Sequence, residues 1–334
     1  MQFESKTAGV QRRQVLLAAA GTVAAGVAPG VFAQARSLAS GPARIVVPFT
    51  PGTTPDLCAR LIAPAMAKRL GQNVIVENRP GASGIIGMES VAKAAPDGTT
   101  VMLTSNTTLT LPFFYQKMSF DVLQSFTALG MLGNSNFALV AHPSFPANTP
   151  RELIAYVKAR PDQVDYASPG KGTLHHLCME KIAHDAGLKM RHIPYKGTAG
   201  AMTDIVGGQV KLMVLPLHIA AGLQADNKLK IIGATRKERD PAFPRVPTLH
   251  EGGITGFDEE GWYGLWGPRG MPADLVALYN ASLRDALAIP ESKVTLDKQG
   301  VAVTPSAPEE LRKIAQAEHD RWGRVIKEAN IQAE

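Results

Sequence analysis

The stretch VPFTPGTTPD, residues 47–56, ends an apolar run and starts a helical pattern almost at once. The run Ile45–Phe49 predicts a strand, and Pro51 and Gly52 predict a turn. Thr54 or Asp56 would cap the helix, with Pro55 in its first turn. Because the free N–H groups of a helix start carry partial positive charge, we expect this turn to hold an anion.

The same design recurs along the chain, as a strand that ends in small polar residues and continues into a helix. Ligands of open α/β sheets bind outside the carboxyl ends of the strands, where these turns lie. Small residues also let an anion approach the backbone closely. The recurring segments are ENRPGASGIIGMES (77–90), LTSNTTLT (103–110), YASPGKGTLHHL (166–177) and IPYKGTAGAMTD (193–204).

Short β-rich segments alternate with helical patterns for most of the length, which predicts an α/β fold with mixed, mostly parallel sheets flanked by helices. The expected strands are 44–49, 74–78, 100–105, 137–142, 164–168, 192–195, 212–216 and 230–235. The expected helices are 56–70, 85–95, 150–159, 173–186, 199–207, 272–288 and 306–329.

The N-terminus has the pattern of a signal peptide. Arg12 and Arg13 precede an Ala/Gly/Val/Leu-rich segment, and Ala33-Gln34-Ala35 supplies small residues for cleavage. We expect residues 1–35 to be removed after export to the periplasm, by either the twin-arginine or the Sec route. The alternative is an uncut membrane anchor. No later segment has the unbroken apolar length of a transmembrane helix.

Charge and cysteine content narrow the function further. The full chain of 334 residues has 35 Lys and Arg against 29 Asp and Glu, without a dense basic run, so nucleic acid is not an expected partner. The length suggests about two domains. Cys58 and Cys178 fall in helices of different predicted lobes. They are expected as separate buried thiols, with a disulfide as the alternative.

Several catalytic or metal patterns are incomplete. His175-His176 has only Glu180 at metal-ligand spacing, and Ser168 lacks the Gly-x-Ser-x-Gly setting of a hydrolase. GASGIIG (81–87) has the wrong glycine spacing for a dinucleotide site. We therefore expect no catalytic residue, metal or cofactor. Trp262, Tyr263 and Trp266 alternate along a strand and either pack in a core or place Tyr263 at a ligand.

With these segments in view, the chain resembles the Bug family, the periplasmic solute-binding proteins of tripartite tricarboxylate transporters. The combination of VENRPGASG, PDG and YKG is specific to it, and further matching pieces lie along most of the chain. The resemblance implies a two-lobed periplasmic binding protein (flytrap) fold. Lobe one would hold 36–141 and 259–334, and lobe two 142–258, with crossings at 137–142 and 261–267.

The resemblance also implies a carboxylate ligand that is held largely by backbone groups of both lobes. The implied ligand-binding residues are Phe49, Thr50, Thr53, Asp56, Ser83, Ser105, Ser168, Gly172, Thr173, His176, Tyr195, Lys196, Gly197 and Asp204. The first turn departs from the family's Pro-Gly-Gly, since Thr53 replaces the second glycine. Thr53 would be strained if its φ were positive, or its hydroxyl would contact the ligand.

The expected function is that of a monomeric, non-enzymatic receptor for a small carboxylated solute, which it delivers to the membrane permease of a tripartite transporter. Two alternatives remain open: a ligand sensor that docks to a signalling partner, and a periplasmic enzyme that uses the same cleft.

Overall fold

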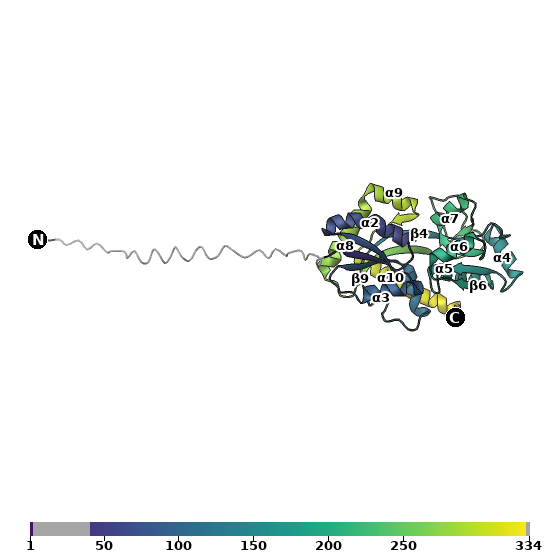
Figure 1. Ribbon diagram of the computed structural model, residues 1–334, viewed down its shortest axis with the longest axis horizontal. Coiled ribbons are helices and arrows are strands. Elements are labelled where there is room, and N and C mark those ends of the chain that lie inside the picture. Colours follow the sequence, from purple (N-terminus) through teal and green to yellow (C-terminus); the bar gives the residue numbers. More distant parts are fainter. Residues whose placement is uncertain (3–40, 332–334) are drawn as a thin grey trace. The chain divides into compact units, whose positions relative to one another are not determined.

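The computed structural model describes residues 1–2 and 41–331 (Figure 1). Beyond its first two residues, the predicted signal peptide lies outside the described residues. All of the helices and strands below belong to the unit Ser37–Glu334. Within the described ranges, no helix has both the length and the apolar character needed to cross a membrane.

The strands are β1 (Ala43–Val47), β2 (Val74–Asn78), β3 (Thr100–Ser105), β4 (Phe126–Ala141), β5 (Asp165–Ser168), β6 (Arg191–Pro194), β7 (Leu212–Pro216), β8 (Lys230–Ala234), β9 (Glu260–Pro268) and β10 (Val301–Val303). The helices are α2 (Thr54–Leu70), α3 (Ile85–Ala92), α4 (Pro150–Lys158), α5 (Leu174–Ala186), α6 (Thr198–Val206), α7 (Leu217–Ala225), α8 (Ala273–Ala288), α9 (Pro290–Lys298) and α10 (Pro308–Glu328), with 3₁₀ helices η1 (Ala82–Gly84) and η2 (Asn106–Phe113).

The long strand β4 takes part in both halves of the sheet, whose strand order is β2-β1-β3-β9-β4-β7-β5-β6. Its residues from Phe126 to Asn136 pair with β9, whereas Phe137 to Ala141 pair with β7. We call β1, β2, β3, β9 and β10 the first half-sheet, and β5 to β8 the second half-sheet. Figure 1 shows α4 to α7 gathered around the second half-sheet and α2, α3, α8 and α9 around the first.

Alternating side chains on each strand build the cores on the two faces of the sheet. In β1, Ile45 and Val47 pack in a cluster with α2 and α8, whereas Val46 faces a cluster that contains α3 and α10 residues. In β7, Val214 packs with α5 on one face and Met213 packs with α6 and α7 on the other. Burying each such side chain contributes roughly 1.5–3 kcal/mol, and the packing fixes the ends of the strands.

The expected strand–helix alternation and the α/β class are confirmed. Strands β1, β2 and β3 pair in parallel with one another through β1, and β6 and β7 pair in parallel with β5. The antiparallel pairings all involve β4 or β9, and they make up more of the sheet than expected.

Part of β4 was not predicted as a strand, because it contains Gly130 and Gly133. The pairing with β9 shifts register beside both glycines. Gly130 has a φ of 152°, and a Cβ at Gly133 would overlap the carbonyl of Ala302. Both glycines therefore serve bulges in a strand rather than a loop. Strand β10 and helices α7, α9 and η2 were also missed.

The two cysteines confirm the expectation of separate thiols. Cys58 on α2 and Cys178 on α5 are both free, and both are fully buried. Burial raises the pKa of each thiol well above its ordinary value. Neither sulfur is therefore poised as a nucleophile.

Candidate ligand-binding site

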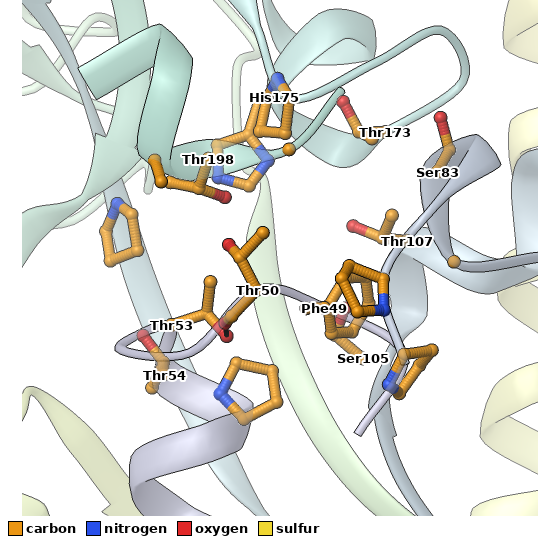
Figure 2. A pocket seen from close by; sticks show the side chains of 18 of the residues that line it. Phe49, Thr50, Thr53, Thr54, Ser83, Ser105, Thr107, Thr173, His175 and Thr198 are labelled. Atoms are coloured by element: carbon orange, nitrogen blue, oxygen red, sulfur yellow. Dashed lines mark hydrogen bonds between the residues drawn. The ribbon is translucent and has the colours of Figure 1, made fainter. Parts of the chain in front are cut away.

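A cavity of about 200 Å³ lies at the carboxyl ends of the strands, with turns from both half-sheets in its wall (Figure 2). It is smaller than the roughly 300–1,000 Å³ of sites for drug-sized ligands, which indicates a small ligand. The polar residues of its wall are Thr50, Thr53, Thr54, Ser83, Ser105, Asn106, Thr107, Thr173, His175, Lys196 and Thr198.

The turn between β1 and α2 is rigid because its own groups pair with one another. Gly52 takes a left-handed φ of 80°, and its N–H donates to Asp56 Oδ2 at 2.9 Å. Thr53 has a φ of −74°, so it carries no strain, and its hydroxyl donates to the Thr50 carbonyl at 2.8 Å. Thr53 thus stabilises the turn, and its position does not require glycine. No side chain caps α2; because Pro55 has no N–H, the first-turn donor at the cavity wall is the Thr54 N–H.

The turn between β6 and α6 touches the first turn from the opposite half-sheet. Gly197 caps α6 with a φ of 136° and no side-chain cap. A Cβ at Gly197 would lie 2.9 Å from Thr50 Cγ2, so only glycine permits this approach. The wall therefore brings together two uncapped helix N-termini, those of α2 and α6, each with a partial positive charge. We call Thr50, Thr53, Thr54, Gly197 and Thr198 the donor corner.

A second set of polar residues on the wall already has hydrogen-bond partners within the protein. The Leu174 N–H, at the start of α5, donates to Thr107 Oγ1 at 3.2 Å, and Thr173 Oγ1 accepts from the His176 N–H. Ser83 Oγ donates to the Lys171 carbonyl at 3.0 Å. Figure 2 shows Ser83, Thr107 and Thr173 on the same side of the cavity. We call these three residues the seam, since their bonds join the two half-sheets.

Eight of the predicted ligand-binding residues line this cavity, and six do not. Those on the wall are Phe49, Thr50, Thr53, Ser83, Ser105, Thr173, Lys196 and Gly197. That they contact a ligand stays a prediction. The six others support the turns from behind, and five of them have side chains that bond elsewhere in the protein.

Asp56 holds the first turn rather than lining the cavity. Asp56 is 2% exposed and accepts hydrogen bonds from the Gly52 N–H and the Asn78 side-chain amide. It also forms an ion pair with Arg60 at 2.9 Å. Burial alone would raise the pKa of its carboxyl, but the bonds from Gly52, Arg60 and Asn78 outweigh burial and lower it. Asp56 is therefore an anion at neutral pH and would repel a carboxylate ligand.

Ser168, Gly172 and His176 lie behind the turn that follows β5. Ser168 is fully buried, and its hydroxyl lies 2.6 Å from His192 Nε2. His176 Nδ1 accepts the Gly172 N–H at 3.2 Å, and its ring stacks on His192 at 4.0 Å. Burial, followed by the charges of His192 and Lys171, lowers the pKa of His176 to about 2. Gly172 has a φ of 74° and packs against the Phe114 ring.

Tyr195 and Asp204 bond to each other behind the α6 turn. The Tyr195 hydroxyl donates to Asp204 Oδ2 at 2.5 Å. Burial and then Asp204 raise the pKa of Tyr195 to about 12, so the phenol stays a donor. The pair clamps the first turn of α6, and this explains their place beside Gly197 without a ligand contact.

The sequence reading missed several residues of the wall that have apolar or neutral side chains. Phe137 pairs with Pro216 across β4 and β7, and Met202 lies one turn after Thr198 on α6. These residues line the cavity together with Ile219 and Thr198. Their apolar side chains resemble ordinary core positions, so no local signal marks them. Tyr263 also lines the cavity, while Trp262 and Trp266 pack in a core cluster.

The wall carries little charge. Among its described residues there is no Asp or Glu, and Lys196, the one permanent cation, is exposed. Burial lowers the pKa of His175 to about 4, so its ring is neutral at pH 7. Its Nδ1 has no hydrogen-bond partner, and the ring meets Phe137 edge-on at 5.2 Å. Across the described ranges no group of three His, Cys, Asp or Glu is placed to hold a metal.

Comparison with known proteins identifies the family of the chain. Residues 58–331 match the family described as the tripartite tricarboxylate transporter family receptor, TctC. The chain belongs to this family. It is 35% identical over 90% of its length to a UPF0065 protein of Bordetella pertussis, and the match covers 93% of that protein. The Bug resemblance is thereby confirmed.

Solved structures of periplasmic binding proteins share the fold. BugD is 34% identical with a TM-score of 0.82, and the match covers 87% of this chain and 98% of BugD. MatC of Rhodopseudomonas palustris, with bound malate, is 32% identical with a TM-score of 0.81 over 85% and 98%. R. palustris Rpa4515, with adipate, is 29% identical with a TM-score of 0.83 over 86% and 97%. The chain is therefore a solute-binding receptor of the Bug type with the flytrap fold, a family of binding proteins rather than enzymes.

Proposed function

We propose that this receptor is exported, binds a small carboxylate in the described cavity and delivers it to the membrane permease of a tripartite transporter. The observation that carries the proposal is the donor corner, where the uncapped N-termini of α2 and α6 meet at one cavity. Each hydrogen bond to a charged group contributes about 1.5–3 kcal/mol. A few such bonds account for micromolar binding without a buried arginine.

Related receptors support the substrate class. MatC and Rpa4515 hold malate and adipate, which are both carboxylates. In this chain the Thr50 hydroxyl, at the donor corner, is buried without a partner. A bound carboxylate would supply the missing acceptor.

The lobe division remains part of the proposal. Lobe one is 36–141 with 259–334, and lobe two is 142–258. The contact of Gly197 with Thr50 and the bond from Ser83 to Lys171 correspond to a closed cleft. Closing would take microseconds to milliseconds, and ligand affinity would be proportional to the closed population. The receptor would act as a monomer, and the permease would recognise the closed form.

The position of the contact between Ser168 and His192 favours a non-enzymatic role. Ser168 Oγ and His192 Nε2 are within hydrogen-bond distance, but Ser168 is fully buried and does not line the cavity. A substrate in the cavity would not reach that hydroxyl.

Calorimetry with matched acids and amides tests the proposal. The mature chain, from Arg36 onward, is titrated with malate, adipate, hexanoate and benzoate, and with the corresponding amides. At least one carboxylate should bind, and its amide should bind at least about tenfold more weakly, because an amide lacks the charge. Equal binding of acid and amide, or no binding by any acid, would contradict the proposal. Export is tested separately by the N-terminal sequence of the periplasmic protein, which should begin at Arg36.

A further inference from the structure

At the donor corner, uncapped helix N-termini from the two half-sheets meet, those of α2 and α6. At the seam, in contrast, the α5 N–H groups and the Ser83 and Thr173 hydroxyls already have partners in the protein. Helix α7 also starts at the wall, where Pro216 and Ile219 line the cavity, and it has no side-chain cap. The donor corner differs from the α7 start because helix N-termini of both half-sheets meet there.

An apolar wall lies beside the donor corner. We define it as Phe137, Met202, Pro216 and Ile219, which all line the cavity. Met202 follows Thr198 by four positions on α6, so the two share one helix face. Phe137 faces Gly261, where a Cβ would lie 2.5 Å from the ring. The side chains of this wall offer contact area but no hydrogen bond to the body of a ligand.

Charged groups on the body of a ligand would find no partner at this wall. No acidic residue of the described wall could pair with an ammonium group. Lys196 is exposed, so it would meet a second carboxylate only in solvent. His175 is neutral at pH 7, because burial lowers its pKa to about 4. A second charge would therefore lose hydration without gaining a buried, oppositely charged side chain.

We infer that the preferred ligand of this receptor has one carboxylate on an uncharged, apolar body, rather than two carboxylates or an amino group. This inference rests on the proposed function, because it assigns the carboxylate to the donor corner. It sets this chain apart from MatC and Rpa4515, which hold malate and adipate. Phe137, Met202 and Ile219 are then the specificity-determining residues.

Three acids with the same six-carbon chain test the inference by calorimetry at pH 7. Hexanoate ends in a methyl group, adipate in a carboxylate and 6-aminohexanoate in an ammonium group. Butyrate, succinate and 4-aminobutyrate repeat the comparison in a shorter chain, and benzoate and terephthalate repeat it with a ring. The mono-acid should bind at least tenfold more tightly than its charged counterparts in the series that binds best.

The outcomes separate the two claims. Tighter binding of the diacid or of the amino acid in the best series would overturn the inference and leave the carboxylate receptor standing. If none of these acids binds, the proposed function fails, and the inference fails with it. Protein for the titrations is dialysed exhaustively so that a co-purified ligand does not occupy the cavity.

A variant with a cation at the apolar wall supplies a second test. Met202→Lys places an ammonium group at the apolar wall, and adipate should then bind more tightly than hexanoate. Met202→Gln has a similar length but no charge, so it should keep the preference for hexanoate. If Met202→Lys still prefers hexanoate while its thermal unfolding matches that of Met202→Gln, Met202 does not face the body of the ligand and the inference is wrong. If Met202→Lys does not fold, the affinities of the wild-type protein for the mono-acids and their charged counterparts still test the inference.

Discussion

Replacing Thr198 with proline removes one backbone donor and one side-chain hydroxyl from the donor corner. Thr198 is the first residue of α6, where proline is well tolerated because this N–H has no partner within the helix. Gly197, with a ψ of 172°, lies outside the α region that a following proline disfavours. The helix and its Tyr195–Asp204 clamp should therefore persist.

The magnitude follows from the bond that is lost. A hydrogen bond to a charged acceptor contributes about 1.5–3 kcal/mol, and each 1.4 kcal/mol changes affinity tenfold. Thr198→Pro should thus weaken carboxylate binding about tenfold to about a hundredfold. The change in thermal stability should be small.

A matched variant separates the N–H from the hydroxyl. Thr198→Val keeps the backbone donor and the side-chain shape but lacks the hydroxyl. Both variants are titrated by calorimetry with the best-binding acid, and circular dichroism checks that both are folded. If Thr198→Pro binds like the wild type, or if Thr198→Val loses as much affinity as the proline variant, main-chain donors of α6 do not hold the ligand.

Three further predictions concern closure, acid stability and the thiols. Gly170→Ala should weaken ligand binding measured by calorimetry, because its Cβ would overlap Ser83 Oγ. Adding Ser83→Ala should restore part of the lost affinity. Unchanged binding by Gly170→Ala alone would show that this contact is not made in the bound state. Burial lowers the pKa of His218 to about 4, below the roughly 6.5 of an unfolded chain, so protonation favours unfolding. The free energy of unfolding, measured with urea, should therefore fall as the pH drops from about 6.5 towards 4. His218→Leu should reduce this pH dependence, and an unchanged pH dependence would refute the assignment. Cys58 and Cys178 should react with a thiol reagent only after unfolding, and the melting temperature should not respond to dithiothreitol; rapid labelling or a reductant-dependent melt would contradict their state as buried free thiols.

The positions of the site turns could be read from the sequence because each is a local event. A β-rich run followed by Gly, Ser, Thr and Pro specifies where a strand ends and a helix begins. These turns contain Thr50, Ser83, Ser105 and Gly197, which the family resemblance implied as ligand-binding residues, and all four line the cavity. The class of fold follows from the same alternation of elements.

The direction of each polar side chain could not be read, because it depends on contacts far along the chain. Asp56 is held by Asn78, which is 22 residues away in sequence, and Ser168 meets His192 at a separation of 24. Their partners decide that these side chains serve the turns rather than the cavity.

Apolar residues of the wall were missed for a related reason. Phe137 and Met202 have the periodicity of core residues, and only the tertiary fold leaves them at a cavity. The glycines of β4 misled the strand assignment, because a bulge and a loop have similar local sequences.

A crystal structure of the protein purified without removal of its ligand tests the central claim most directly. The account predicts a carboxylate at the donor corner, with its oxygens about 2.7–3.2 Å from first-turn N–H groups of both α2 and α6. A ligand whose carboxylate lies at Lys196 or at the seam instead, with the two helix N-termini facing only solvent, would contradict it.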